Sequence, residues 1–189
     1  MKKSLAITLV EMLIVISILT NVSGILVAIF ISGWRLFHQQ SASTETQAQA
    51  KLATSVITKS IQQANKVPTS KTLDSISYTS STNTLVLELP SLDTNQNIIE
   101  GAFDYEVFYK DPAAHTKLKL KRETSPASSR KSETKTIANL IENIEFTYNS
   151  PDNKIENTNR ITVSVSAAQI SYGKTQKTSL TGQAKLRNK

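Results

Sequence analysis

An uninterrupted apolar run near the N-terminus constrains this chain more than any other feature. The run from Met12 to Trp34 reads MLIVISILTNVSGILVAIFISGW and contains no charged residue. As a helix, its 23 residues are long enough to cross the ~30 Å hydrocarbon core of a bilayer. Lys2 and Lys3 precede the run, so the positive-inside rule predicts a single-pass protein with its N-terminus in the cytoplasm and its body on the other side of the membrane.

Two simpler explanations compete with a functional membrane segment. A secretory signal peptide has a shorter apolar core that ends in a small-residue cleavage site. A plain single-pass anchor explains the length of the run but does not explain Glu11, which directly precedes it. A carboxylate at the centre of a membrane helix costs roughly 2.5 kcal/mol or more. Glu11 therefore calls for a partner or a function, unless its side chain only reaches back to the membrane surface.

The residues around Glu11 carry a recognisable motif. The stretch AITLVE from Ala6 to Glu11, followed by MLIVI, resembles the N-terminus of type IV prepilins and pseudopilins. In that family a prepilin peptidase removes a short basic leader, and the new N-terminal residue is methylated. The resemblance implies cleavage between Ala6 and Ile7, N-methylation of Ile7, and an assembly role for Glu11, which would pair with the N-terminal amine of a neighbouring subunit. The family more often has Gly before the cut and Phe after it.

The helix is expected to continue beyond the membrane. Neither Gly nor Pro occurs between Ser41 and Lys66, and apolar residues recur there at spacings of three and four: Ala53, Val56, Ile57, Ile61 and Ala64. This spacing predicts a helix with one apolar face. Val67 and Pro68 should end it, because a residue before proline disfavours the helical conformation. One helix from about residue 7 to 66 would be ~90 Å long.

After Pro68 the apolar period changes from 3.6 to 2. Alternating runs occur at residues 84–89, 103–109, 117–121, 144–148, 161–167 and 180–187. This pattern predicts an antiparallel sheet with one apolar face, which the helix stripe would cover. Residues 137–142 are predicted to form a short second helix.

The resulting fold class is α+β and pilin-like, with a long N-terminal helix packed on an antiparallel β head. The expected divisions are a leader (1–6), a hydrophobic transmembrane and assembly helix (7–37), its amphipathic continuation (38–66) and the head (67–189). The stretches 61–64, 140–148 and 185–188 resemble larger minor pilins and J-type minor pseudopilins. The resemblance implies three partners: other pilin or pseudopilin subunits, a prepilin peptidase and the cytoplasmic membrane. The head would be periplasmic or extracellular.

The sequence offers little basis for catalysis or metal binding. His38 and His115 are isolated, there is no cysteine, and no nucleophile or phosphate-binding motif occurs. We therefore expect no enzyme activity, no cofactor and no metal. The segment Asp93–Asn97 has the oxygen spacing of the first half of a calcium loop, but it lacks the glycine and the acid at the required later positions. A polar turn is predicted there instead.

A mildly basic character leaves one alternative function open. The net charge is +7, and residues 117–135 combine a lysine face with a basic Ser/Thr-rich loop, which we expect to be mobile and solvated. This segment is the candidate for contact with nucleic acid, although it has no interleaved aromatic residues for base stacking. The sequence thus predicts a structural minor pilin or pseudopilin of a type IV pilus or type II secretion pseudopilus. The alternative is a minor pilin that contacts DNA or another ligand during uptake or adhesion.

Overall fold

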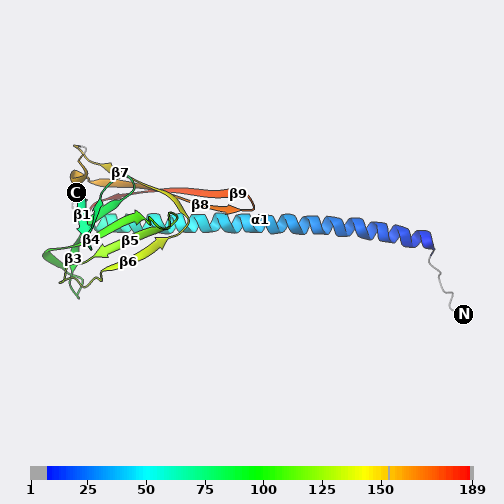
Figure 1. Cartoon of the computed structure of the whole chain (residues 1–189), viewed down its shortest axis with the longest axis horizontal. Helices are drawn as coiled ribbons and strands as arrows, with labels where there is room; N and C mark the ends of the chain where they lie inside the picture. Colours follow the sequence, from blue (N-terminus) through cyan, green and yellow to red (C-terminus); the bar gives the residue numbers. More distant parts are fainter. Residues whose placement is uncertain (1–7, 153, 188–189) are drawn as a thin grey trace. The chain divides into compact units, whose positions relative to one another are not determined.

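The computed structural model describes residues 8–152 and 154–187 (Figure 1). By its internal contacts the chain divides into two compact units, Met1–Ser41 and Ala42–Lys189. The first unit is called the apolar segment below, and the second is called the head. The leader expected at residues 1–6 lies outside the described residues.

A single long helix, α1 (Leu9–Gln63), supplies residues to both units. It ends three residues before the expected boundary at Lys66. The backbone N–H of Asn65 donates to the carbonyl oxygen of Glu88 at 2.8 Å, and Lys66 forms an isolated antiparallel bridge with Glu88. The chain therefore leaves the helix to pair with a strand before it reaches Pro68.

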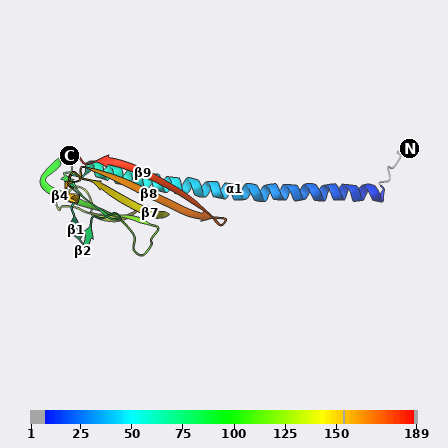
Figure 2. The same cartoon turned by 90° about the horizontal axis from the view of Figure 1, so that it is seen from above.

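The head adds nine strands, all paired antiparallel, in the part of the chain that the structure describes (Figures 1 and 2). A hairpin consists of β1 (Ser70–Leu73) and β2 (Ile76–Thr79). A four-stranded sheet has the order β3 (Leu85–Leu92), β4 (Ile98–Lys110), β5 (Leu118–Glu123) and β6 (Glu133–Ala138). A three-stranded sheet has the order β7 (Ile141–Asn149), β8 (Arg160–Ser171) and β9 (Lys174–Lys185), and a short 3-10 helix, η1 (Ile155–Asn157), precedes β8. The predicted α+β class is confirmed.

The predicted apolar face of the helix is confirmed within the head. The helix buries Ala42, Thr46, Ala50, Ala53, Ile57, Ser60 and Ile61, which recur mainly at spacings of three and four. These residues join one hydrophobic core with the inward faces of both larger sheets, including Leu87 of β3, Phe146 of β7 and Val163 of β8. Two contacts fix the helix laterally: Thr46 Oγ1 lies 3.2 Å from Thr178 Oγ1, and Gln49 Oε1 accepts from the N–H of Asn139.

The expectation of a helix at residues 137–142 is wrong. Strand β6 ends at Ala138, β7 begins at Ile141, and Leu140 between them has a φ of 60°. Ala138 and Ile141 are both buried, but on two different strands. The two buried residues are three positions apart, as on one face of a helix, because only a tight turn separates the two strands.

The expectation of a sheet with only one covered face is also wrong. Tyr105, Val107 and Tyr109 share a face of β4, as the alternation predicted, but Phe108 between them packs in the main core. The β1–β2 hairpin covers the other face and forms a second cluster that contains Leu73, Val86 and Val107, with Tyr78, Tyr105 and Tyr109 beside it. Strand β3 is buried along almost its whole length for the same reason.

At Gly182, strand β9 lies close against α1. A Cβ atom at this position would lie 2.6 Å from Thr54 Cγ2 and 3.0 Å from Thr58 Oγ1. Thr54 is β-branched and therefore stiff in a helix, so it cannot easily turn away. We expect Gly182→Ala to lower the free energy of unfolding by about 1–3 kcal/mol, the usual cost of overpacking a core. Denaturant unfolding of the detergent-solubilised chain, followed by circular dichroism, measures this.

The neighbouring substitution Thr181→Ala is the matched control, because the Thr181 side chain is exposed on the same strand. The double variant Gly182→Ala, Thr54→Ala should recover part of the loss, since it removes the clashing methyl group. Equal stability of Gly182→Ala and the wild type would show that the strand lies farther from the helix than described here.

Candidate assembly site and head clefts

The structure describes one of the three residues expected at the assembly site, Glu11. Ala6 and Ile7, the expected cleavage and methylation positions, lie outside the described residues. Glu11 lies in the first turn of α1, and the helix begins two residues before it, at Leu9.

Glu11 takes part in a reciprocal cap at the start of this helix. Its Oε2 accepts a hydrogen bond from the backbone N–H of Thr8 at 2.8 Å and another from the Thr8 hydroxyl at 3.0 Å. In return, the backbone N–H of Glu11 donates to Thr8 Oγ1 at 3.3 Å. This is a capping box, in which two N–H groups that lack helical partners are satisfied by side chains. The sequence analysis missed it, although the Thr-x-x-Glu spacing before an apolar run is its signature.

The apolar segment exposes its side chains on every side of the helix. All described residues from Thr8 to Phe37 are exposed, and they include the apolar side chains of Leu9, Met12, Ile18, Ile25, Phe30 and Trp34. The helix is long and apolar enough to cross a membrane. Two of its polar side chains bond to the backbone of the same helix: Thr20 Oγ1 donates to the carbonyl of Ile16, and Asn21 Nδ2 donates to that of Ser17. Such bonds reduce the cost of polar groups in lipid.

The basic loop of the head, which the sequence predicted to be mobile and solvated, is exposed at positions 126–127 and 131–135 but is held at three residues by contacts with β4. Asp104 of β4 is fully buried and holds it in place. The Asp104 carboxylate accepts from Ser91 Oγ, Ser128 Oγ, the backbone N–H of Ser125 and Arg130 Nη1, at 2.7 to 3.0 Å. Arg130 Nη1 also donates to the carbonyl of Pro90 at 2.7 Å. A buried carboxylate requires such donors, so these contacts attach the loop to β4.

Most of the cations in residues 117–135 are paired with acids. Arg122 lies between Glu106, which is buried, and Glu133. Three further ion pairs involve this segment: Lys119–Asp111, Lys121–Asp74 and Lys135–Glu133, at 2.7 to 2.9 Å. With Arg130, five of the seven basic residues in this segment are in ion pairs. Nucleic-acid contact through this segment remains a prediction, and these pairs reduce the charge available for it.

The Asp93 carboxylate bonds within its own turn. Asp93 Oδ1 accepts from the backbone N–H groups of Asn95 and Asn97, both at 2.8 Å. The hydrogen bond from Asn97 is the main cause that lowers the pKa of Asp93. These contacts form the Asx-type turn that a polar turn would show. Among the described residues, no group of three or more His, Asp or Glu side chains is arranged to hold a metal ion.

The two histidines lie in unrelated surroundings. His38 belongs to α1, with its ring 4.8 Å from that of Trp34 and 5.7 Å from that of Phe37. His115 is exposed in the β4–β5 turn.

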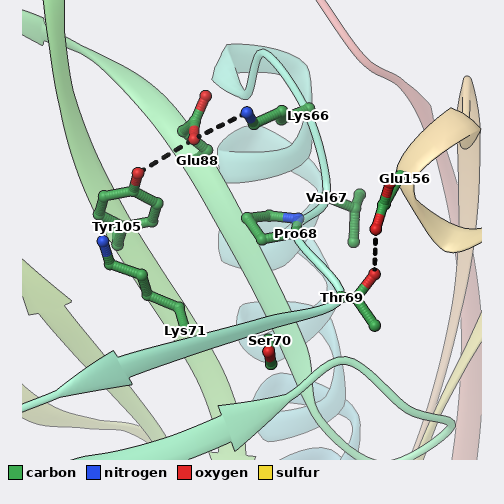
Figure 3. A pocket seen from close by; sticks show the side chains of 9 residues that line it. All are labelled: Lys66, Val67, Pro68, Thr69, Ser70, Lys71, Glu88, Tyr105 and Glu156. Carbon is green, nitrogen blue, oxygen red and sulfur yellow. Dashed lines mark hydrogen bonds and ion pairs between the residues drawn. The ribbon is translucent and has the colours of Figure 1, made fainter.

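A polar cleft of about 390 Å³ opens in the head, where the chain passes from α1 to β1 (Figure 3). Its wall contains Glu88, whose Oε2 accepts from the Tyr105 hydroxyl at 3.1 Å and pairs with Lys66 Nζ at 3.3 Å. Lys71 Nζ lies 3.9 Å from the centre of the Tyr105 ring. No sequence pattern predicted this cleft, because its lining comes from segments far apart in the chain.

Two tyrosines of β4 have raised pKa values. Burial and, to a lesser extent, the Glu88 carboxylate raise the pKa of Tyr105 to about 12. Burial, with smaller effects of Tyr78 and Asp111, raises the pKa of Tyr109 to about 12. Both hydroxyls therefore stay protonated in the folded head at pH values where an exposed tyrosine has lost its proton.

This shift predicts a loss of stability in alkali. Above the ordinary pKa of 10.0, the unfolded chain releases the Tyr109 proton first, so the free energy of unfolding should decrease as the pH rises from 10 through 12. Tyr109→Phe removes this titration and should make the decrease shallower. Urea unfolding of both proteins at a series of pH values measures the slopes. Identical slopes would contradict the assigned burial of the hydroxyl.

Comparisons with known proteins do not assign the chain to a family. No protein-family model matches the chain, and no curated protein matches its sequence.

Proposed function

We propose that this chain is a structural minor pilin or pseudopilin, which is processed by a prepilin peptidase and built into a type IV pilus or a type II secretion pseudopilus. The observation that carries the proposal is the contrast within α1. Its N-terminal part exposes apolar side chains on all sides, whereas its C-terminal part buries one face under antiparallel sheets. A helix with these two surfaces suits a subunit that is stored in a membrane and later packs against copies of similar helices.

Glu11 is the residue to which this function assigns a specific role. After cleavage behind Ala6, Ile7 would carry a free amine, and Glu11 would meet the amine of a neighbouring subunit in the filament. Two opposite charges attract strongly where the dielectric constant is low, whereas either charge alone is costly. Such a pair would set the axial register of the subunits.

In this proposal the apolar segment also determines the location. Before assembly the chain is a single-pass protein of the cytoplasmic membrane, with the head on the periplasmic or extracellular side. In this proposal the head supplies a surface for contact with other subunits. The ion pairs of residues 117–135 favour this structural role over contact with nucleic acid.

Processing gives the first test. In cells that contain the peptidase, mass spectrometry should find the mature N-terminus at Ile7, with one methyl group on its amine. In cells that lack the peptidase, Met1 to Ala6 should remain attached. An intact N-terminus in both strains, or a cut after Thr20, would contradict the proposal, because the first result means a plain anchor and the second a signal peptide.

Assembly gives the second test, and the capping box supplies a matched pair of variants. Glu11→Gln removes the charge, but glutamine at this position still forms a capping box. Thr8→Val removes the cap, at a cost of about 1 kcal/mol in helix stability, and keeps the charge. Both variants should insert into the membrane and be cleaved. Only Glu11→Gln should lose efficient incorporation, because the amine of the neighbour would stay buried without a counter-charge.

Membrane and sheared-filament fractions, compared by immunoblot, provide the measurement. The reverse result, in which Thr8→Val fails to assemble and Glu11→Gln assembles normally, would show that Glu11 acts only as a helix cap.

A further inference from the structure

Strand β4 carries an apolar bulge near its start. Where β4 pairs with β3, the four residues 99–102 of β4 stand opposite a single residue of β3, and Gly101 among them has a φ of 73°. Ile98 and Phe103 flank these extra residues and are 45% and 39% exposed, although both are large and apolar. Residues 98–103 are called the β4 bulge below. Exposed apolar groups on such a feature invite contact with another surface.

The other end of β4 borders a groove of about 580 Å³, which is called the tyrosine groove below. The groove lies between β2 and the β4–β5 turn, and its apolar lining is Ile76, Tyr78, Tyr109 and Pro112. The Tyr78 and Tyr109 rings have their centres 5.3 Å apart and are inclined at 47°. Ile76 beside them is 53% exposed. Aromatic rings of this kind favour a further aromatic ring packed at an angle, so the groove suits an apolar knob.

The β4 bulge and the tyrosine groove cannot meet within one chain. Six residues of strand, ~20 Å, separate Phe103 from Tyr109. Strand β4 pairs with β3 on one side and with β5 on the other, so it does not bend back on itself. A contact between bulge and groove therefore requires two chains, and each of them keeps a second, unused feature. Head-to-tail contacts of this kind generate rings or open filaments rather than two-fold pairs.

The β4 bulge belongs to an acidic part of the chain. Residues 91–103 contain Asp93 and Glu100 but no lysine or arginine. Asp93 bonds within its own turn. Glu100 is exposed in the bulge and takes part in no ion pair within the part of the chain that the structure describes. Glu100 is thus the acid that a partner of the bulge would meet.

The turn beside the tyrosine groove is basic. Residues 110–119 contain three lysines and one histidine against a single acid, Asp111. Asp111 pairs with Lys119 at 2.8 Å. Lys117 is exposed, and no ion pair among the described residues includes it. The turn therefore presents charge opposite in sign to that of the β4 bulge, and such complementarity favours one orientation of a partner.

We propose that the tyrosine groove binds the β4 bulge of a second copy of this chain, with Phe103 beside the two tyrosine rings and Glu100 facing Lys117. The inference rests on the proposed function, because it assigns this contact to neighbouring subunits of a filament. One bulge in one groove is a small contact, below the roughly 1,000 Å² of a stable interface. In a filament the contact gains strength because the other contacts hold the subunits close together.

The absence of cysteine in the chain permits a direct test. Full chains carrying Ile98→Cys are mixed in detergent with tagged, longer full chains carrying Ile76→Cys, and a short bis-maleimide cross-linker is added. Detergent leaves the two heads free to meet at any stagger. We expect the mixed dimer to exceed both same-variant dimers on denaturing gels. Ser77→Cys, exposed on the opposite face of the same strand, is the matched control and should give little mixed dimer.

Charge reversal tests the orientation of the two copies. Glu100→Lys in the Ile98→Cys chain, or Lys117→Glu in the Ile76→Cys chain, should reduce the mixed dimer about fivefold, the effect of ~1 kcal/mol from an exposed ion pair. With both reversals present, one in each chain, the yield should recover. Glu45→Lys reverses an exposed acid of α1 and should leave the yield unchanged.

Each contrary result has a distinct meaning. Equal yields with Ile76→Cys and Ser77→Cys would overturn the inference, and so would a double reversal that restores nothing. Dimers mainly between two Ile98→Cys chains would replace it with a two-fold contact between bulges. Ala102→Cys tests the same bulge if Ile98→Cys does not fold. None of these measurements involves cleavage or the charge of Glu11, so their failure would leave the proposed function intact, whereas an unprocessed N-terminus in cells would overturn that function and not the cross-link.

Discussion

The burial of one face of α1 is the interaction on which the head depends. Ala50, Ala53, Ile57 and Ile61 are fully buried, and both larger sheets contribute apolar side chains to the same core. Burial of apolar surface contributes roughly 25 cal/mol per Å² removed from water. Small residues on this face allow strands to lie close to the helix, and Gly182 is a strand position where a Cβ atom would not fit without a shift of its neighbours.

The inward-facing acids of β4 are the second constraint. Asp104 and Glu106 are buried on the face of β4 that Phe108 shares, and a buried carboxylate without partners is strongly destabilising. Arg130 and Arg122 meet this need, together with serine hydroxyls and a backbone N–H. As a result, part of a loop whose composition predicts a solvated segment is attached to β4. This attachment depends on charge and hydrogen bonding rather than on apolar contact.

The sequence predicted the elements that are set by local periodicity and missed those that depend on distant residues. Alternation correctly indicated β3, β5, β7 and β8, and spacing correctly indicated the buried face of α1. The β1–β2 hairpin was not predicted, because its strands have four residues each and are largely polar. Because that hairpin was not predicted, the second face of β4 was expected to be exposed to solvent. The cleft around Glu88 and the ion pair between Asp104 and Arg130 could not be predicted either. Each brings together segments that are far apart in the chain.

The capping box was predictable, and it changes how the proposed role of Glu11 is understood. A carboxylate in the first turn of a helix is favoured by the helix dipole, and here it also accepts two hydrogen bonds from Thr8. Glu11 therefore has hydrogen-bond partners within its own chain, so the proposed storage in a membrane would not leave its charge without hydrogen bonds. In the proposed filament the carboxylate would gain a cationic amine, while the N–H of Thr8 remains within its reach. The energetic difference between storage and assembly then lies in the charge of the new partner rather than in the number of hydrogen bonds, which makes the pairing a determinant of register more than of overall stability.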